Sequence, residues 1–312
     1  MNPSISSQTP VGLPQAQLVA EVEAVLRDTV RARGLPRNLA DAVVYAGLGP
    51  GKRVRPTLVV RSYEAVAGPW GLGPMPASLA AAAVSIEMIH AFSLVHDDLP
   101  AMDDDDLRRG RPTLHKHTSE AMALLAGDSL LSMAFERLLD EAACRPDDAA
   151  SHFQAVRLTR ELGRATTDMI AGQVYDSLPA FDPHIPEVDR LGLIHRHKTA
   201  ALLRAACRMG GICAQAQPEQ LDALSRYAEA VGLMFQVVDD LLDVTGDAEE
   251  LGKATQKDAA AGKLTYPGLM GMDGARAEVQ RLRDTAHAAL EPLGDGAAAL
   301  ARLADDLAIR RK

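Results

Sequence analysis

Apolar residues recur at helical spacing along most of the chain. In residues 18–31, Val19, Val22 and Val25 fall on one face of a predicted helix, and Gly34 then ends the pattern. Further helices are predicted at residues 39–46, 76–98, 118–142, 150–177, 187–213, 218–244, 272–292 and 296–309, and another after the glycine-rich turn at 48–56. No segment alternates convincingly between apolar and polar residues, as a half-buried strand would. The pattern predicts an all-α fold, a bundle of about ten to twelve helices.

The longest apolar run, residues 77–95, could cross a bilayer by its length alone. Glu87 and His90 lie near its centre, and four consecutive alanines precede them. These features favour a helix buried in a protein core, because charged groups are costly inside a membrane. We therefore predict no membrane span.

Composition narrows the class of protein. Hydrophobic residues make up 47% of the 312 residues, which excludes a disordered chain, and the 4% of aromatic residues argues against a β-rich protein. A net charge of −9 argues against nucleic acid as a partner, since a nucleic-acid site needs a basic surface. We see no linker and no internal repeat, so residues 1–312 are predicted to form a single domain, with residues 1–16 as a flexible tail.

The cysteines and the N-terminal segment bear on the compartment. Cys144, Cys207 and Cys213 form neither a disulfide framework nor a zinc-binding pattern. The first residues lack both the basic region and the apolar region of a secretion signal. We expect a protein of the reducing cytoplasm.

The densest chemistry lies in residues 90–112, HAFSLVHDDLPAMDDDDLRRGRP. Six aspartates fall within ten residues here, at positions 97, 98, 103, 104, 105 and 106. Crowded carboxylates repel one another, and Mg²⁺, which prefers oxygen ligands, relieves that repulsion. Arg108, Arg109 and Arg111 follow, and guanidinium groups match phosphate oxygens. The stretch predicts a site for Mg²⁺ and a diphosphate, with a solvated acidic loop as the simpler alternative.

A second acidic cluster lies far down the chain. Asp239, Asp240 and Asp243 end the apolar run GLMFQVVDDLLDV, and Asp239 and Asp243 share one face of a helix. Carboxylates placed where a buried helix surfaces are costly unless they are paired or ligated. We therefore predict that the two clusters face a shared cleft.

The first cluster needs a break in its helix to act as a ligand pair. Asp97 and Asp103 are six residues apart and would not share a face of an ideal helix. Pro100 blocks a smooth continuation of the helix between them. A bulge or loop is therefore predicted to bring both aspartates to one side.

Basic residues gather in three places. Lys52, Arg53 and Arg55 stand where a turn leads into a helix N-terminus, which adds its own positive field. Lys198 and Thr199 interrupt an otherwise apolar helix. A polar, glycine-rich loop at residues 246–266 carries Lys253, Lys257 and Lys263 and could act as a lid. A basic surface turn, a solvated lysine and a plain connecting loop are the simpler alternatives.

Taken together, these motifs resemble those of the trans-isoprenyl diphosphate synthases, and especially the bacterial farnesyl diphosphate synthases. DDLPAMD and DDDLRRGRP, with GKRVRP upstream and FQVVDDLLD downstream, carry the resemblance. IHAFSLVHDD, HRHKT and GKLTYP add further landmarks, so the match runs in order from about residue 45 to about residue 270. The resemblance implies an all-α fold with a deep central cavity, a homodimer, and Mg²⁺-dependent condensation of an allylic diphosphate with isopentenyl diphosphate. About three Mg²⁺ ions are implied.

The resemblance also assigns roles to individual positions. It implies that Asp97, Asp103 and Asp239 bind metal, with Asp98, Asp240 and Asp243 in support. Residues matching those that hold the allylic diphosphate are Arg108, Lys198, Thr199, Gln236, Lys253 and Lys263. Residues matching those that hold isopentenyl diphosphate are Lys52, Arg55, His90 and Arg109. Gln173 and Asp176 match a helix position that lines the same cavity.

The length of the product is a finer question. The growing chain would extend along the helix that carries Asp97, and Phe92 and Ser93 lie about one turn upstream. In this family a bulky aromatic residue at that point resembles a floor that stops growth at fifteen carbons, while a small residue tends to allow twenty. We therefore expect mainly farnesyl diphosphate from a dimethylallyl or geranyl primer. Phe92 as an ordinary core residue is the simpler alternative.

Four other functions are alternatives to a farnesyl diphosphate synthase. A geranylgeranyl diphosphate synthase of the same family, or a non-catalytic partner subunit, would share the motifs. A phosphohydrolase is suggested by the dipeptide His96-Asp97, but it leaves the second acidic cluster unexplained. A terpene cyclase would not be expected to carry a second aspartate motif or the basic GKRVRP turn.

Overall fold

The computed structural model describes residues 13–70, 73–178, 181–182, 184–245 and 264–310. Within these residues the fold is all-α, as predicted, and its only sheet is a hairpin of two-residue strands. The first part contains α1 (Gln15–Arg33), α2 (Arg37–Gly47), α3 (Val54–Ala67), α4 (Ala77–Asp97), β1 (Leu107–Arg108), β2 (Arg111–Pro112), α5 (Leu114–His117), α6 (Glu120–Ala143) and α7 (Ala149–Ser177). The second part contains α8 (Glu187–His195), the π-helical turn η1 (Arg196–Ala200), α9 (Ala201–Cys213), α10 (Pro218–Thr245), α12 (Tyr266–Leu290), the 3₁₀ turn η2 (Glu291–Ala297) and α13 (Ala298–Ala308).

Most predicted helices are confirmed, with differences at a few places. α1 begins at Gln15, inside the segment predicted as a tail. The helix predicted at 187–213 is interrupted by η1. The last long helix begins at Tyr266 instead of residue 272, with a kink at Gly271, whose φ of 74° glycine adopts without strain. The hairpin and α5 follow the acidic run and were not predicted.

Side chains cap several helices at the ends that the sequence suggested. The Ser119 hydroxyl accepts a hydrogen bond from the Met122 N–H at the start of α6, and Asp148 does the same for α7 through Ser151. Such caps satisfy amide groups that have no partner inside the helix. They fix where α6 and α7 begin, and α7 lines one cavity of the site described below.

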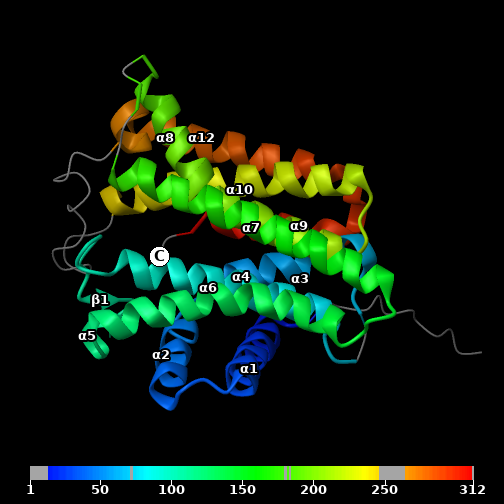
Figure 1. Cartoon of the computed structure of the whole chain (residues 1–312). Coiled ribbons are helices and arrows are strands. Elements are labelled where there is room, and N and C mark those ends of the chain that lie inside the picture. Colours follow the sequence, from blue (N-terminus) through cyan, green and yellow to red (C-terminus); the bar gives the residue numbers. More distant parts are fainter. Residues whose placement is uncertain (1–12, 71–72, 179–180, 183, 246–263, 311–312) are drawn as a thin grey trace, which may run out of the picture.

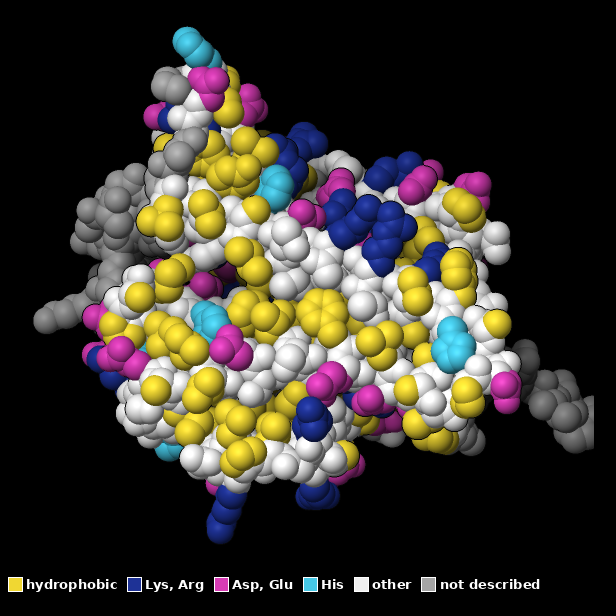
Figure 2. All heavy atoms as spheres, viewed as in Figure 1, with side chains coloured by type: hydrophobic (Ala, Val, Ile, Leu, Met, Phe, Trp, Pro, Cys, Tyr) yellow, Lys and Arg dark blue, Asp and Glu magenta, His cyan; other side chains and the backbone are white. Residues whose placement is uncertain are grey.

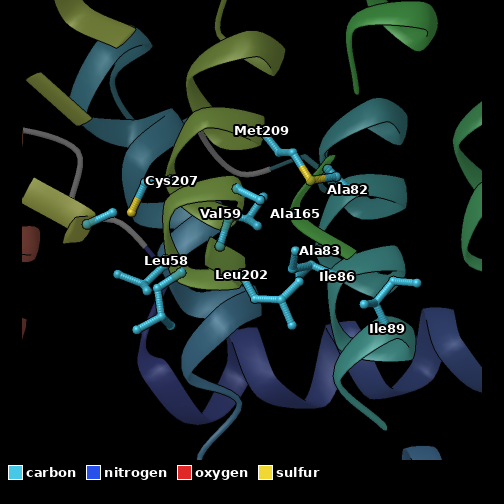
Figure 3. Close-up of a cluster of buried hydrophobic side chains, with 14 of the residues drawn as sticks. Leu58, Val59, Ala82, Ala83, Ile86, Ile89, Ala165, Leu202, Cys207 and Met209 are labelled. Atoms are coloured by element: carbon cyan, nitrogen blue, oxygen red, sulfur yellow. The ribbon is translucent and has the colours of Figure 1, made fainter. Parts of the chain in front are cut away.

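α4 is the central helix of the bundle. The long helices lie roughly side by side in Figure 1, with α1 and α2 beneath them. Ala82, Ala83 and Ile86 of α4 pack among apolar side chains of α3, α7 and α9 (Figure 3). α4 is long and apolar enough to span a membrane, but most of it is buried inside the protein. A helix that is apolar on all sides is stable when other helices surround it.

Candidate active site

Two cavities meet beside α4. The α4–α7 cavity has a volume of about 520 Å³ and is lined mainly by α4, α7 and η1. The α3–α10 cavity has a volume of about 610 Å³ and is lined by the turn at residues 50–53 and by α3, α4, α10 and α13. Arg55, His90 and Thr199 line both cavities. The two spaces therefore adjoin, and groups bound in them would lie next to each other.

The break after α4 brings Asp97 and Asp103 together, as predicted. α4 ends at Asp97, and the Asp103 N–H donates a hydrogen bond to the Asp97 carbonyl oxygen at 2.9 Å. Burial raises the pKa of Asp97 to about 6, with nearby Lys198 opposing the rise and Asp103 adding to it. A carboxylate held in this setting gains most from a cation.

Asp98 is already occupied by an arginine. Arg108 donates from Nε and from Nη2 to Asp98 Oδ1, at 2.8 and 2.6 Å. Burial raises the pKa of Asp98, and the bonds to Arg108 oppose that rise. β1 supplies Arg108, so the hairpin fixes the guanidinium at the mouth of the acidic cluster. Asp98 thus positions Arg108, while Asp97 and Asp103 are better placed as metal ligands.

The second cluster has partners from distant parts of the chain. Asp239 Oδ1 accepts a hydrogen bond from Arg310 Nη1 at 2.8 Å, and Asp240 Oδ2 accepts one from the Tyr266 N–H at 2.8 Å. Asp243 is exposed. Burial raises the pKa of Asp239 to about 6, Arg310 opposes this, and Asp243 adds to it.

The donor set suits Mg²⁺. The ends of α4 and α10 that carry the two clusters lie at the same end of the molecule (Figure 1). Among the described residues no three carboxylates or histidines lie close enough to hold a metal without other ligands. Mg²⁺ typically takes one or two carboxylates and completes its shell with water and substrate phosphate. Asp97 with Asp103, and Asp239, fit that pattern, and their sharing of a cleft stays a prediction.

The π-helical turn η1 presents Lys198 and Thr199 to the α4–α7 cavity. Lys198 Nζ donates to Asp176 Oδ2 on α7 at 2.5 Å. α7 can approach this closely because residue 172 is glycine: a Cβ atom there would lie 2.1 Å from the Lys198 backbone nitrogen. Sequence reasoning missed Gly172, although a glycine inside a helical pattern is a recognised sign of close packing.

Cationic residues surround the α3–α10 cavity. Its lining includes Lys52, Arg55, His90 and Arg109. Burial lowers the pKa of Arg55 to about 10, so its guanidinium stays charged at neutral pH. Burial, together with Arg55 and Arg109, holds the pKa of His90 well below its usual range, so its ring is neutral. The lining therefore combines three cationic side chains with a neutral imidazole, groups that suit an anion.

A glycine also shapes this cation cluster. The Arg109 Nη1 atom donates to the Pro50 carbonyl oxygen at 2.6 Å. A Cβ atom on Gly51 would lie 2.3 Å from that same nitrogen, so glycine leaves room for the guanidinium in this position. The glycine-rich turn therefore helps to place Arg109 as well as the basic residues within it.

Phe92 lies at the wall of the α4–α7 cavity. Its side chain is 7% exposed, and its ring meets the ring of His96 edge-on with centroids 5.0 Å apart. Ser93 lines the same cavity and donates its hydroxyl to the His90 carbonyl oxygen. His96 Nε2 lies 3.2 Å from the Leu124 carbonyl oxygen, which can only accept, so this nitrogen carries a proton and is not a metal ligand.

The remaining predicted residues fall into three groups. Gln173 lines the α4–α7 cavity and donates to the Ser177 hydroxyl. Gln236 is half-buried on α10 and is not among the described residues that line the two cavities. Lys253 and Lys263 lie outside the described residues.

Sequence reasoning also missed Arg310. It lines the α3–α10 cavity, packs over the Phe235 ring at 5.2 Å, and pairs with Asp239. Only the composition of the C-terminal sequence, IRRK, hints at it. Its bond to Asp239 depends on the packing of α13 beside α10, which no local sequence pattern reveals.

Known proteins similar to this chain support the same kind of site. The polyprenyl synthetase family model matches residues 36–300. The Arabidopsis thaliana protein named geranylgeranyl pyrophosphate synthase 11, chloroplastic, is 44% identical over 283 residues, which cover 88% of this chain and 75% of that protein. A geranyltransferase structure from Legionella pneumophila has a TM-score of 0.80 at 31% identity and covers 95% of each chain. A putative farnesyl-diphosphate synthase from Marinomonas sp. MED121 has a TM-score of 0.74 at 35% identity, covering 95% of this chain and 99% of that one. The chain therefore belongs to the polyprenyl synthetase family of trans-prenyl diphosphate synthases and is a prenyltransferase.

Proposed function

We propose that the chain condenses an allylic diphosphate with isopentenyl diphosphate and releases mainly farnesyl diphosphate. The observation that carries this proposal is the junction of the two cavities at Arg55, His90 and Thr199. The lining of one cavity combines Asp97 and Lys198 with apolar side chains. The lining of the other includes Lys52, Arg55 and Arg109. Two anionic substrates bound in them would lie with their reactive carbons together.

The chain's own residues support each stage of this reaction. Arg108 and Lys198 would hold the allylic diphosphate as its carbon–oxygen bond breaks and the diphosphate leaves with the electron pair. Met169 and Phe92, both buried, would give the allylic cation an apolar surrounding that excludes water. Mg²⁺ bound by the aspartates would neutralise the leaving diphosphate.

The second substrate then supplies the new bond. Arg55, His90 and Arg109 would hold isopentenyl diphosphate so that its double bond attacks the allylic cation. The new carbon–carbon bond leaves a cation on the isopentenyl unit, and loss of a proton to the released diphosphate restores a double bond. No side chain has to act as the base.

Phe92 supports the fifteen-carbon product. Its ring lies at the wall of the α4–α7 cavity and is braced by His96. A buried aromatic ring in that place would stop the growing chain, because close-packed interiors yield little to an extra isoprene unit.

A product assay tests both parts of the proposal. Purified protein, Mg²⁺ and isopentenyl diphosphate are incubated with dimethylallyl or geranyl diphosphate, and the dephosphorylated products are sized by mass. We expect farnesol from the wild type and geranylgeraniol or longer from Phe92→Ala. Ser93→Ala, which lines the same cavity but removes only a hydroxyl, serves as the matched control and should keep the fifteen-carbon product. An unchanged product from Phe92→Ala would show that the floor lies elsewhere.

A geranylgeranyl diphosphate synthase is the second candidate. It is favoured by the names of the Arabidopsis thaliana relatives, such as geranylgeranyl pyrophosphate synthase 9, chloroplastic, which is 45% identical over 253 residues. The same assay separates the two: geranylgeraniol from the wild type would keep the reaction and replace the product.

We also propose a homodimer through the face formed by α6 and α7. Apolar side chains spread over this face in Figure 2, around a hollow between α7 and the α4–α6 pair in which acidic side chains lie. The exposed apolar residues on the two helices are Leu124, Leu125, Leu139, Phe153, Val156, Ile170 and Val174. A patch of this kind usually marks an interface.

Light scattering should give a dimer for the wild type and a monomer for Leu125→Lys with Val156→Lys. Two relatives are named heterodimeric large subunits, so a monomeric wild type would point to a different partner.

A further inference from the structure

Arg53 stands between Lys52 and Arg55 but has no part in the proposed reaction. Its side chain is only 4% exposed, which is rare for an arginine. Its backbone has a φ of 49° at the start of α3, a left-handed conformation that residues with a Cβ atom seldom adopt. A buried, charged residue in such a conformation persists only where the surrounding contacts hold it.

The guanidinium of Arg53 joins three elements. Nη2 donates to Glu23 Oε1 of α1 at 2.8 Å and to the Gly49 carbonyl oxygen at 2.8 Å, and Nε donates to the same Glu23 oxygen at 3.1 Å. Nη1 donates to Glu87 Oε1 of α4 at 3.1 Å. The side chain thus links α1, the turn that begins at Gly49, and α4. Charge-assisted bonds in a buried setting are among the strongest that a side chain makes.

Glu87 connects this anchor to the α3–α10 cavity. Its carboxylate is buried and lines that cavity, and its Oε2 atom has no hydrogen-bond partner among the described residues. Burial raises the pKa of Glu87, while Arg53, Arg55 and Arg109 all lower it. The carboxylate is therefore the buried counter-charge for three guanidinium groups around one cavity.

We propose that Arg53 is a positioning residue for the isopentenyl diphosphate site. Its anchors on α1 and α4 hold the turn at residues 49–52 so that Lys52 and Arg55 face the α3–α10 cavity. The same turn receives Arg109 through the Pro50 carbonyl oxygen. This inference rests on the proposed function.

Replacing Arg53 should affect the binding of one substrate and not of the other. The cations assigned to the allylic diphosphate, Arg108 and Lys198, belong to β1 and η1 and are held by Asp98 and Asp176. None of these contacts passes through the turn at residues 49–52. Loss of the anchor should therefore weaken binding of isopentenyl diphosphate and leave binding of the allylic substrate nearly unchanged.

Steady-state kinetics on the full chain with Mg²⁺ test this. Arg53→Ala should raise KM for isopentenyl diphosphate about tenfold and change KM for geranyl diphosphate less than about twofold. Arg53→Lys keeps the charge but not the planar fork that reaches three acceptors at once, so its KM should fall between those of the wild type and Arg53→Ala.

Arg208 offers a matched control. Its Nε donates to Glu161 Oε1 at 2.7 Å and its Nη1 to the Ser225 hydroxyl at 2.9 Å, so it links α9 to α7 and α10. It lies outside the described residues that line the two cavities. Arg208→Ala should lower Tm and leave both KM values unchanged, as expected of an anchor with a purely structural role.

A second variant keeps the proposal testable if Arg53→Ala folds poorly. Glu23→Gln weakens only the α1 anchor and should raise KM for isopentenyl diphosphate about threefold. The proposal is overturned if both KM values rise equally, or if KM for isopentenyl diphosphate stays within about twofold in Glu23→Gln and in folded Arg53→Ala. A wild-type protein that forms no product from isopentenyl diphosphate would overturn the proposed function itself.

Discussion

The two aspartate clusters end buried helices in the same way but are completed by different kinds of contact. In the first cluster, Asp98 is paired with Arg108, ten residues further along the chain, on a hairpin that directly follows the acidic run. In the second, Asp239 is paired with Arg310, 71 residues away at the far end of the chain. Burial raises the pKa of Asp97 and of Asp239 to about 6 in both places. The electrostatic problem is the same, but the arginine of the first cluster comes from the next hairpin, with the distant Lys198 also opposing the rise at Asp97, whereas the arginine of the second comes from beyond α13.

Removing one carboxylate from each cluster tests whether both serve one reaction. Asp97→Ala and Asp239→Ala should each lower kcat about 10³-fold, because each removes a carboxylate that we propose binds Mg²⁺ at the leaving group. The double variant should lose far less than the product of the two effects, since groups that act as a unit are not additive. Steady-state kinetics at saturating Mg²⁺ would measure this.

Asp106 provides the control within the same acidic run. It is exposed and paired with Lys116 at 2.9 Å, so Asp106→Asn should retain turnover. Near-normal turnover in either Asp97→Ala or Asp239→Ala would contradict the assignment of that cluster as a metal site.

The arginine partners should differ in their effect on stability. Arg108→Ala leaves a carboxylate that is 5% exposed without its partner and should lower the free energy of unfolding by about 3 kcal/mol. Arg310→Ala should cost about 1 kcal/mol or less, because Arg310 and Asp239 remain about a third exposed and water can replace the bond. Urea unfolding without substrate or metal measures both. Equal losses of unfolding free energy would show that Arg108 and Arg310 stabilise the fold equally.

The raised pKa values of Asp97 and Asp239 predict the smallest effect, a pH dependence of Mg²⁺ binding and of folding stability. If Asp97 and Asp239 bind Mg²⁺ as proposed, their protonation competes with the metal, so the half-saturating concentration of Mg²⁺ should rise as the pH falls below about 6. The stability of the metal-free protein should change in the opposite direction. Because the folded pKa lies above the unfolded value, these groups add stability as the pH falls from about 7 towards 4. Calorimetric titration with Mg²⁺ across this range, repeated on Asp97→Ala, would assign the remaining pH dependence to the second cluster. A half-saturating concentration that does not change with pH would contradict both pKa shifts.

Features encoded within a few residues were predictable. The helical spacing gave most helices, and Pro100 with the spacing of Asp97 and Asp103 predicted the turn that brings them together. The sequence also pointed to the basic turn before α3 and to Arg109, which the structure places on the lining of one cavity; their binding of an anion stays a prediction. In each case the interacting groups are neighbours in sequence, so local chemistry specifies them.

Other parts of the site could not be predicted, because their partners are distant in sequence. The π-helical turn at Lys198 interrupts a helix that the apolar pattern shows as continuous. Gly172 matters only because α7 presses against the backbone of that turn. In the sequence Arg53 cannot be distinguished from its neighbours Lys52 and Arg55. Only the packing of α1 and α4 brings Glu23 and Glu87 to its guanidinium.

By itself the sequence determined the helical class, the position of most long helices to within about six residues, and where the two aspartate clusters end their helices. The tertiary structure decided which carboxylates are already paired, how η1 aims Lys198, and that Arg310 returns to Asp239. The physical reason is one of range. Helix formation and charge density depend on residues within a turn or two of each other, whereas pairing and burial depend on which surfaces the packed helices bring together.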